Sequence, residues 1–302
     1  MSTIKNYKEL RAALSPKLDY NLFKKNRMLG LIAFFAFLLY WLLFAIGYHY
    51  PITIIVIAII LGCISEFLSM VCHDVLHGSV FKSKNFSVLF CIPISLLTMI
   101  SPSFWKFWHN FHHSSVDRWT TSARPYEMGY ETFGYPKIRK YAGFLELFFF
   151  KAFHLNYTQM KFLLDKRYKS SAHLAVKKAT LIQYTLIIAF KIYLFWALPF
   201  VIWLGLELVP LLIQNFLSSI FLVTQHSYKL EKGETIRTFS VGMPRWIEIF
   251  TLNNGYHVEH HLLPNLPSKH LPTLRKILEN DFQQFPQDKF SMMEALKIIY
   301  KK

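Results

Sequence analysis

Residues 29–72 read LGLIAFFAFLLYWLLFAIGYHYPITIIVIAIILGCISEFLSMVC, two long apolar runs separated by His49-Tyr50-Pro51. A helix of about 20 apolar residues crosses the roughly 30 Å of hydrocarbon in a bilayer. The first run, 29–48, contains no charged residue, and the second, 52–72, contains only Glu66. The connection is too short to hold a domain, so this stretch predicts a hairpin of two transmembrane helices.

A second pair of apolar runs lies in the C-terminal half. Residues 180–203 carry Lys191 near their centre, and residues 206–223 follow after little more than Leu204 and Gly205. Shorter apolar stretches at 86–100 and 143–155 contain Pro93 or have Lys and His beside them, which favours re-entrant or interfacial helices. We therefore expect an all-α integral membrane protein with four transmembrane helices in two hairpins. A single domain would cover 1–302, with a helical cap formed from the segments 1–28, 73–179 and 224–302.

The charge pattern predicts the orientation. The chain has 34 Lys and Arg against 18 Asp and Glu, a formal charge of +16. Of the 34 basic residues, 33 lie in the three segments outside the expected helices. Basic residues favour the cytoplasmic side of a membrane, so both termini and the long middle segment are expected there. Topology and lipid head groups account for the basic charge, and we expect no nucleic-acid partner.

The histidines are the residues that point to a chemical function. Eight of the 13 fall into three clusters, HDVLH at 73–77, HNFHH at 109–113 and HVEHH at 257–261. Residues three or four apart share one face of a helix, so each cluster presents its imidazoles together. One more histidine follows the last apolar run and brings the candidate metal ligands to nine. They are His73, His77, His109, His112, His113, His226, His257, His260 and His261.

The number and position of these histidines predict a metal site with two ions. Neutral imidazole is a good ligand for iron, copper, zinc and nickel. Nine candidates exceed what one ion uses, since a zinc site needs three or four ligands. All nine lie on the predicted cytoplasmic side, where a cap over the helix ends would bring them together near the membrane surface.

The order of the clusters resembles the membrane-bound fatty acid desaturase family. HDVLH is followed about 32 residues later by HNFHH, then by the second apolar pair and by NGYHVEHHLLPNLP. The resemblance covers most of the chain and implies two irons held by the eight cluster histidines, with His226 as a ninth ligand. Three residues between His73 and His77, and Leu222 one turn before His226, are closer to acyl-lipid enzymes than to acyl-CoA desaturases.

The same resemblance implies the partners. O2 is the expected co-substrate, a fatty acyl lipid the expected substrate, and membrane lipids the surroundings. No His-Pro-Gly-Gly heme-binding motif occurs, so we expect electrons from an external donor, a ferredoxin or a b-type cytochrome with its reductase.

Carboxylates are expected to support the histidines, because ligating imidazoles usually donate their second N–H to a neighbouring acceptor. Asp74 and Glu259 lie inside clusters, and Glu66 precedes His73 by two helical turns. A carboxylate inside an apolar helix is costly without a partner. We therefore expect Glu66 to accept a hydrogen bond from His73 or His77.

Three further residues are candidates with open alternatives. Asn253 is placed to hydrogen-bond a ligand, although a loop role is as plausible. Trp105 and Trp108, just before the second cluster, are candidates for the wall of an acyl tunnel, with anchoring at the membrane interface as the alternative.

These features predict an O2-dependent di-iron desaturase that introduces a double bond into a lipid acyl chain. An oxidant generated from O2 at reduced iron can attack unactivated methylene C–H bonds. The same site would suit a hydroxylase, an acetylenase or a decarboxylase. A more distant alternative is a metal transporter or a heme-binding membrane protein. A transporter should place ligands near mid-bilayer and a heme protein single histidines within two spans, whereas these clusters lie beyond the apolar runs.

Overall fold

The computed structural model describes residues 7–115, 146–226, 238–282 and 289–300, with only the backbone described at some helix ends and in part of one helix. This part of the chain is mostly helical, and four of its helices are long and apolar enough to cross a membrane. They are α2 (Arg27–His49), α3 (Ile54–Leu76), α8 (Ser171–Ala197) and the continuous helix of α9 (Phe200–Trp203), the π-helical turn η6 (Leu204–Leu208) and α10 (Val209–His226).

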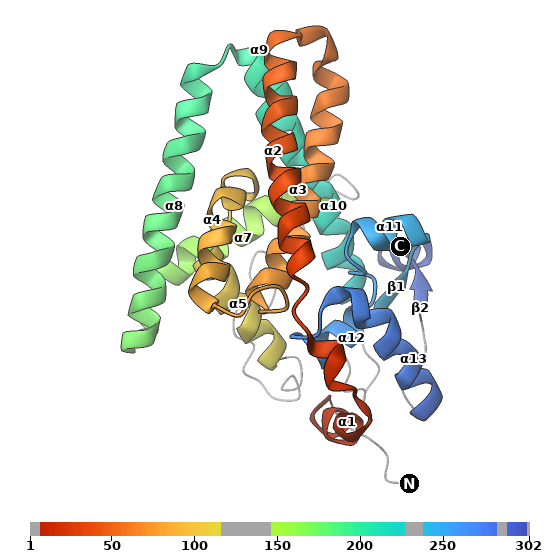
Figure 1. Ribbon diagram of the computed structural model, residues 1–302. Helices are drawn as coiled ribbons and strands as arrows, with labels where there is room; N and C mark the ends of the chain where they lie inside the picture. Colours follow the sequence, from red (N-terminus) through yellow and green to blue (C-terminus); the bar gives the residue numbers. More distant parts are fainter. Residues whose placement is uncertain (1–6, 116–145, 227–237, 283–288, 301–302) are drawn as a thin grey trace.

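α3 is longer than its apolar run. It packs beside α2, to which it is joined by η3 (Pro51–Thr53), and it continues past the expected boundary at Cys72 (Figure 1). The helix ends where Gly78 adopts the left-handed φ of 75°. Gly78 N–H then donates to the Val75 carbonyl at 3.0 Å and Ser79 N–H to the Asp74 carbonyl at 3.1 Å. This Schellman motif fixes where the helix stops, and therefore where the first histidine cluster points.

The connection in the second apolar pair was expected at Leu204-Gly205, and this expectation is wrong. α8 ends at Ala197, and Leu198 is extended (ψ 144°) before Pro199. Proline disfavours the helical conformation in the residue before it, so the break lies at Leu198. Leu204 and Gly205 instead belong to η6, inside the second helix.

α10 lies against α3 at a close helix crossing. A Cβ atom added to Gly62 of α3 would lie 2.6 Å from the Cβ of Ile213 in α10. Small residues allow helices in a membrane to approach to this distance. The crossing brings the end of α10 beside the end of α3 that carries the first cluster.

The middle of the chain forms a bent pair of helices. α4 (Lys84–Thr98) and α5 (Pro102–Ser115) meet at 98°, with Met99 in a left-handed conformation at the bend. α7 (Glu146–Leu164) follows and packs on α10. A re-entrant or interfacial helix was expected at 86–100, and a bent pair of this kind is either a broken span or a re-entrant loop. The bend carries α5, with the second cluster, to the end of α3.

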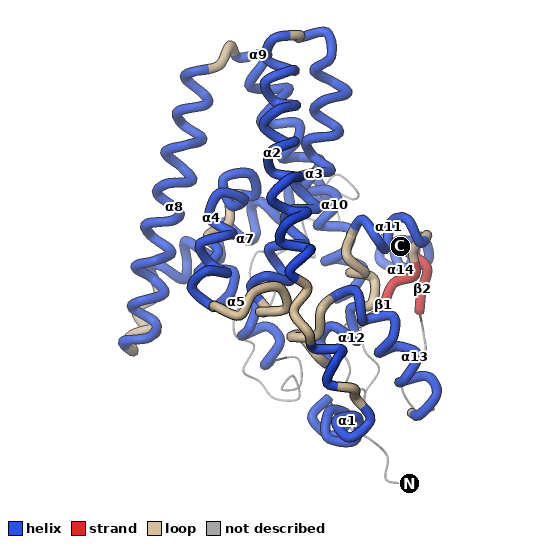
Figure 2. Tube along the Cα trace, in the orientation of Figure 1, coloured by secondary structure: helices blue, strands red, loops and turns tan. Residues whose placement is uncertain are grey.

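Shorter elements gather at the same end (Figure 2). They are α1 (Tyr7–Leu14), η1 (Ser15–Lys17), η2 (Tyr20–Phe23), β1 (Ser240–Gly242), α11 (Arg245–Phe250), α12 (His257–Leu262), η7 (Ser268–His270), α13 (Leu271–Asp281), β2 (Lys289–Ser291) and α14 (Met292–Tyr300). β1 and β2 pair in parallel, with Val241 opposite Phe290. The expected all-α fold is therefore wrong in this detail, because strands of three residues are too short to show an alternating pattern.

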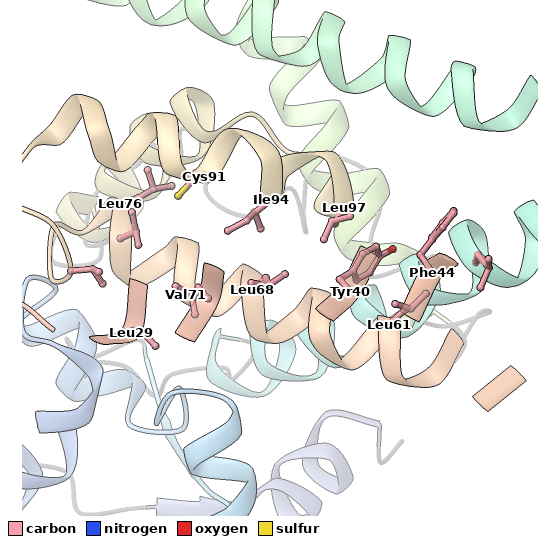
Figure 3. Packing of buried hydrophobic residues seen from close by; sticks show 14 of the residues in the cluster. Leu29, Tyr40, Phe44, Leu61, Leu68, Val71, Leu76, Cys91, Ile94 and Leu97 are labelled. Carbon is pink, nitrogen blue, oxygen red and sulfur yellow. The ribbon is translucent and has the colours of Figure 1, made fainter. Parts of the chain in front are cut away.

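Hydrophobic cores hold the long helices and the shorter elements in place, and two of them bear on the histidine clusters. Between the long helices, Leu68 and Val71 of α3 lie opposite Ile94 and Leu97 of α4 (Figure 3). A second core joins α1, α12 and α13. On the outside, apolar side chains stay exposed along the long helices, for example Ile55, which is 74% exposed. Such an apolar surface suits lipid rather than water.

Candidate metal centre

Three helices bring the histidine clusters together. His73 lies in the last turn of α3 and His77 directly follows it, so both imidazoles leave one face of the helix. α5 carries the second cluster in its last turns. The third cluster occupies α12, a helix of six residues whose side chains are all buried.

The eight cluster histidines form two groups of candidate ligand atoms, each within 4.8 Å of one another. The five-histidine group comprises His73, His77, His109, His113 and His260, and the three-histidine group comprises His112, His257 and His261. The division does not follow the clusters. α5 contributes His112 to one group and its other two histidines to the other, while α12 contributes His260 to the larger group.

The spacing of the imidazoles fits a coordination shell. The Nε2 separations are 2.9 Å for His73 and His109, 3.1 Å for His109 and His113, 3.0 Å for His113 and His260, 3.2 Å for His112 and His261, and 3.1 Å for His261 and His257. Two nitrogens bound to one metal at about 2.1 Å lie about 3.0 Å apart at a right angle and about 3.4 Å apart at the tetrahedral angle. Both groups therefore have the dimensions of metal sites.

Burial prepares these side chains for a metal. Loss of water around the ring, followed by repulsion from neighbouring histidines, lowers the pKa of His257 and His260 well below 6.5. A neutral imidazole keeps its lone pair for a metal. Within the described residues, Nε2 of His77 is buried without a hydrogen-bond partner, which is the state expected of a nitrogen reserved for an ion.

Asp74 lies beside a candidate ligand and joins two parts of the site. One carboxylate oxygen is 3.6 Å from Nδ1 of His73, slightly beyond hydrogen-bond distance. The other accepts a hydrogen bond from the Ser268 backbone N–H at 3.3 Å. Asp74 therefore connects the end of α3 to the segment that follows α12.

Glu259 supports α12 rather than an imidazole. Its carboxylate is fully buried, accepts a hydrogen bond from the Ser240 hydroxyl at 2.6 Å and pairs with the Arg275 guanidinium at 3.0 Å. Arg275 also pairs with Glu279 at 2.7 Å. Sequence reasoning missed Arg275, because only the folded chain shows that α13 lies against α12.

Glu66 is buried, as a carboxylate in an apolar helix must be, but its described partners are not the expected ones. It accepts hydrogen bonds from the Gln214 amide at 3.1 Å and from the Ser218 hydroxyl, both on α10. Two helical turns separate it from His73 by about 10 Å along the axis, beyond the reach of the side chain. The carboxylate therefore contacts the neighbouring helix.

Two other residues were candidates from the sequence. The structure describes the contacts of Asn253 but not the side chain of His226. Asn253, at a left-handed φ of 56°, donates to the Ser268 carbonyl at 3.1 Å and accepts from Arg245 at 3.3 Å. These contacts hold the loop before α12. His226 is the last residue of α10, and its side chain lies outside the described part of the structure.

One buried charge inside the long helices escaped the sequence reasoning. Glu207, in η6, is 4% exposed and forms an ion pair with Lys191 of α8 at 2.5 Å. A lysine within an apolar run was the available signal, since a charge there needs a partner.

A cavity of about 110 Å³ is lined by histidines of both groups and by other side chains of the surrounding helices. Its wall includes His73 and His109 from the five-histidine group, and His112 and His257 from the three-histidine group. Most of the remaining wall is apolar and comes from α3, α4, α5 and α10. Both groups of candidate ligands therefore face one apolar space.

Trp105 and Trp108 also line this cavity. Trp105 stacks on His109 with ring centroids 4.7 Å apart, and Trp108 stacks on His112 at 5.9 Å. Trp108 is only 6% exposed, which favours the cavity wall over anchoring at the membrane interface. Each indole therefore packs against the ring of one candidate ligand.

Comparison with known proteins extends these findings. Residues 50–293 match the family model described as fatty acid desaturase. The sphingolipid delta(4)-desaturase/C4-monooxygenase of Bos taurus is 28% identical over 240 residues, 75% of this chain and 66% of the relative. Its counterpart in Rattus norvegicus is 27% identical over 241 residues, 75% of this chain and 66% of the relative. The sphingolipid delta(4)-desaturase of Homo sapiens is 39% identical over 64 residues, 21% of this chain and 18% of the relative. The chain thus spans about two thirds of the length of the first two relatives.

Proposed function

The chain belongs to the fatty acid desaturase family, and from this premise we propose that it introduces a carbon–carbon double bond into the acyl chain of a lipid, using O2. Membership makes the protein an oxidoreductase. Removing two hydrogens with one O2 requires two further electrons and two protons, and it releases two waters. The electrons therefore come from an external donor.

The observation that carries the proposal is the shared cavity. We propose one iron in each histidine group, with His226 as a further ligand. The wall of the cavity contains two imidazoles from each group, so a methylene pair in this space lies beside both. Iron bound there would supply activated O2, an oxidant able to attack an unactivated C–H bond.

The side chains of the protein prepare this space for the reaction. Neutral imidazoles hold the ions without adding charge, and the two tryptophans fix the planes of His109 and His112. The apolar wall binds an acyl chain and excludes water, which protects the reaction from side products.

Orientation and partners follow from the charge pattern. Of the 34 basic residues, 33 lie outside the expected transmembrane runs, which supports a cytoplasmic location for both termini and the histidine groups. A ferredoxin or a b-type cytochrome with its reductase is the proposed electron donor, and it would reach the site from that side.

Hydroxylation of the acyl chain is the second candidate. The printed names of the bovine and rat relatives combine a desaturase with a C4-monooxygenase, so one site of this family is named for both outcomes. Acetylenic bond formation and decarboxylation would use the same ligands. Family membership, together with ligands gathered beyond the apolar runs, favours an enzyme over a metal transporter or a heme-binding protein.

Lipid analysis tests the proposal. The wild type, His260→Ala and His49→Ala would each be expressed, with candidate reductases, in a host that lacks the activity. His49 is exposed beyond the metal centre and serves as the matched control. We expect a new unsaturated lipid with the wild type and His49→Ala, and none with His260→Ala. Identical profiles for the wild type and His260→Ala would contradict the proposal, and a purely hydroxylated product would favour the second candidate.

A further inference from the structure

α12 is a very short helix that carries three candidate metal ligands. Its six residues form one and a half turns and carry His257, His260 and His261. A helix this short is marginal without outside contacts, because few backbone hydrogen bonds close within it. The last carbonyl groups of a helix also accept no hydrogen bond from within the helix. Something outside must hold this end.

The N-terminal helix supplies that contact. The guanidinium of Arg11 in α1 donates from Nε to the Leu262 carbonyl at 2.8 Å and from Nη2 to the His261 carbonyl at 3.1 Å. Both acceptors lie at the C-terminal end of α12, where a positive charge is favoured by the helix dipole. One of them is the backbone of a candidate ligand.

Packing fixes the position of Arg11. Leu10 and Leu14, on either side of it in α1, are buried in a core shared with Val258 and Leu262 of α12. Figure 1 shows α1 next to α12, although 250 residues separate Arg11 from His261. The rigid fork of the guanidinium can bind two carbonyls at once, which an ammonium group cannot do in the same geometry.

We propose that Arg11 is a positioning residue of the three-histidine group. It fixes the C-terminal end of α12, and with it the direction of the His261 imidazole toward His112 and His257. The N-terminal helix α1 then helps to position one of the proposed metal ligands. This inference rests on the proposed binding of one ion by each histidine group.

Three variants test the role of Arg11. Arg11→Met keeps the apolar stem and removes the donors, Arg11→Lys keeps the charge, and Lys8→Met changes an exposed residue of the same helix. Iron per chain is measured on the purified proteins, before and after a challenge with a chelator. We expect about two irons in the wild type and in Lys8→Met. In Arg11→Met, one of the two should bind about 10-fold or more weakly, as for other residues that orient ligands.

The outcomes separate the two claims. Selective weakening of one iron in Arg11→Met, with a partial effect in Arg11→Lys, supports the positioning role, because a general loss of packing would release both ions together. Wild-type retention of both irons in Arg11→Met overturns it. If Arg11→Met does not fold, Arg11→Lys decides by the same measurement. Fewer than two irons in the wild type itself would count instead against the proposed function.

Discussion

The charges around α12 are buried as deeply as its histidines. Glu259 is fully buried, and its carboxylate is held by the Ser240 hydroxyl and the Arg275 guanidinium. A buried carboxylate is tolerated only with partners of this kind, because water no longer stabilises its charge. The side chain therefore joins α12 to β1 and α13.

Replacing Glu259 with Gln should destabilise the protein. Removal of one partner leaves the Arg275 guanidinium less well paired at a buried position, and losses of about 3–5 kcal/mol are typical for such a break. Glu279→Gln is the matched control, since its carboxylate meets the same arginine but is 43% exposed, and it should cost less than about 1 kcal/mol. Thermal unfolding of both variants checks this, and equal losses would contradict it.

The candidate ligands could be predicted from the sequence because their spacing alone places them on helix faces. The partner of Glu66 could not, since Gln214 and Ser218 lie about 150 residues away in the chain and only the crossing of α3 with α10 brings them near. Arg11 and Arg275 were equally invisible for the same reason.

At the scale of the elements, an ion pair ties α8 to the neighbouring helix. Lys191 and Glu207 lie 2.5 Å apart, with side chains 16% and 3% exposed. In the same part of α8, Phe190 contacts Trp41 of α2 with ring centroids 6.0 Å apart, and α8 stands apart from the other long helices in Figure 1. The pair therefore helps to hold this part of α8 against η6.

Breaking this pair should be worse than removing it. Glu207→Leu alone leaves a lysine without its partner in an apolar setting, at a cost of about 3 kcal/mol or more, whereas the double variant Lys191→Met with Glu207→Leu should recover much of the loss. Midpoints of thermal unfolding in one detergent compare the two. Losses that simply add would show that the ion pair does not couple the helices.

The apolar runs predicted α2 and α3 almost in full, because length and composition suffice for a long helix. The end of α8 was misplaced because Leu204-Gly205 looks like a turn, whereas Pro199 sets the break and the later residues continue as η6. The strands β1 and β2 were missed since their pairing joins segments that are far apart in the chain.

At the scale of the whole molecule, the candidate metal ligands come together where three helices meet. α3, α5 and α12 each carry one cluster, but the five-histidine and three-histidine groups mix members of different clusters. The sequence predicted that the clusters would gather and that two ions would bind. The division into groups could not be predicted, because it depends on the 98° bend between α4 and α5 and on the place of His260 of α12 beside His73 of α3.

Metal analysis of the purified wild-type protein tests the central claim most directly. Two compact groups of imidazoles facing one apolar cavity predict about two irons per chain and no heme absorption. The measurement needs neither the substrate nor the electron donor. A single iron per chain, zinc in place of iron, or bound heme would contradict the account.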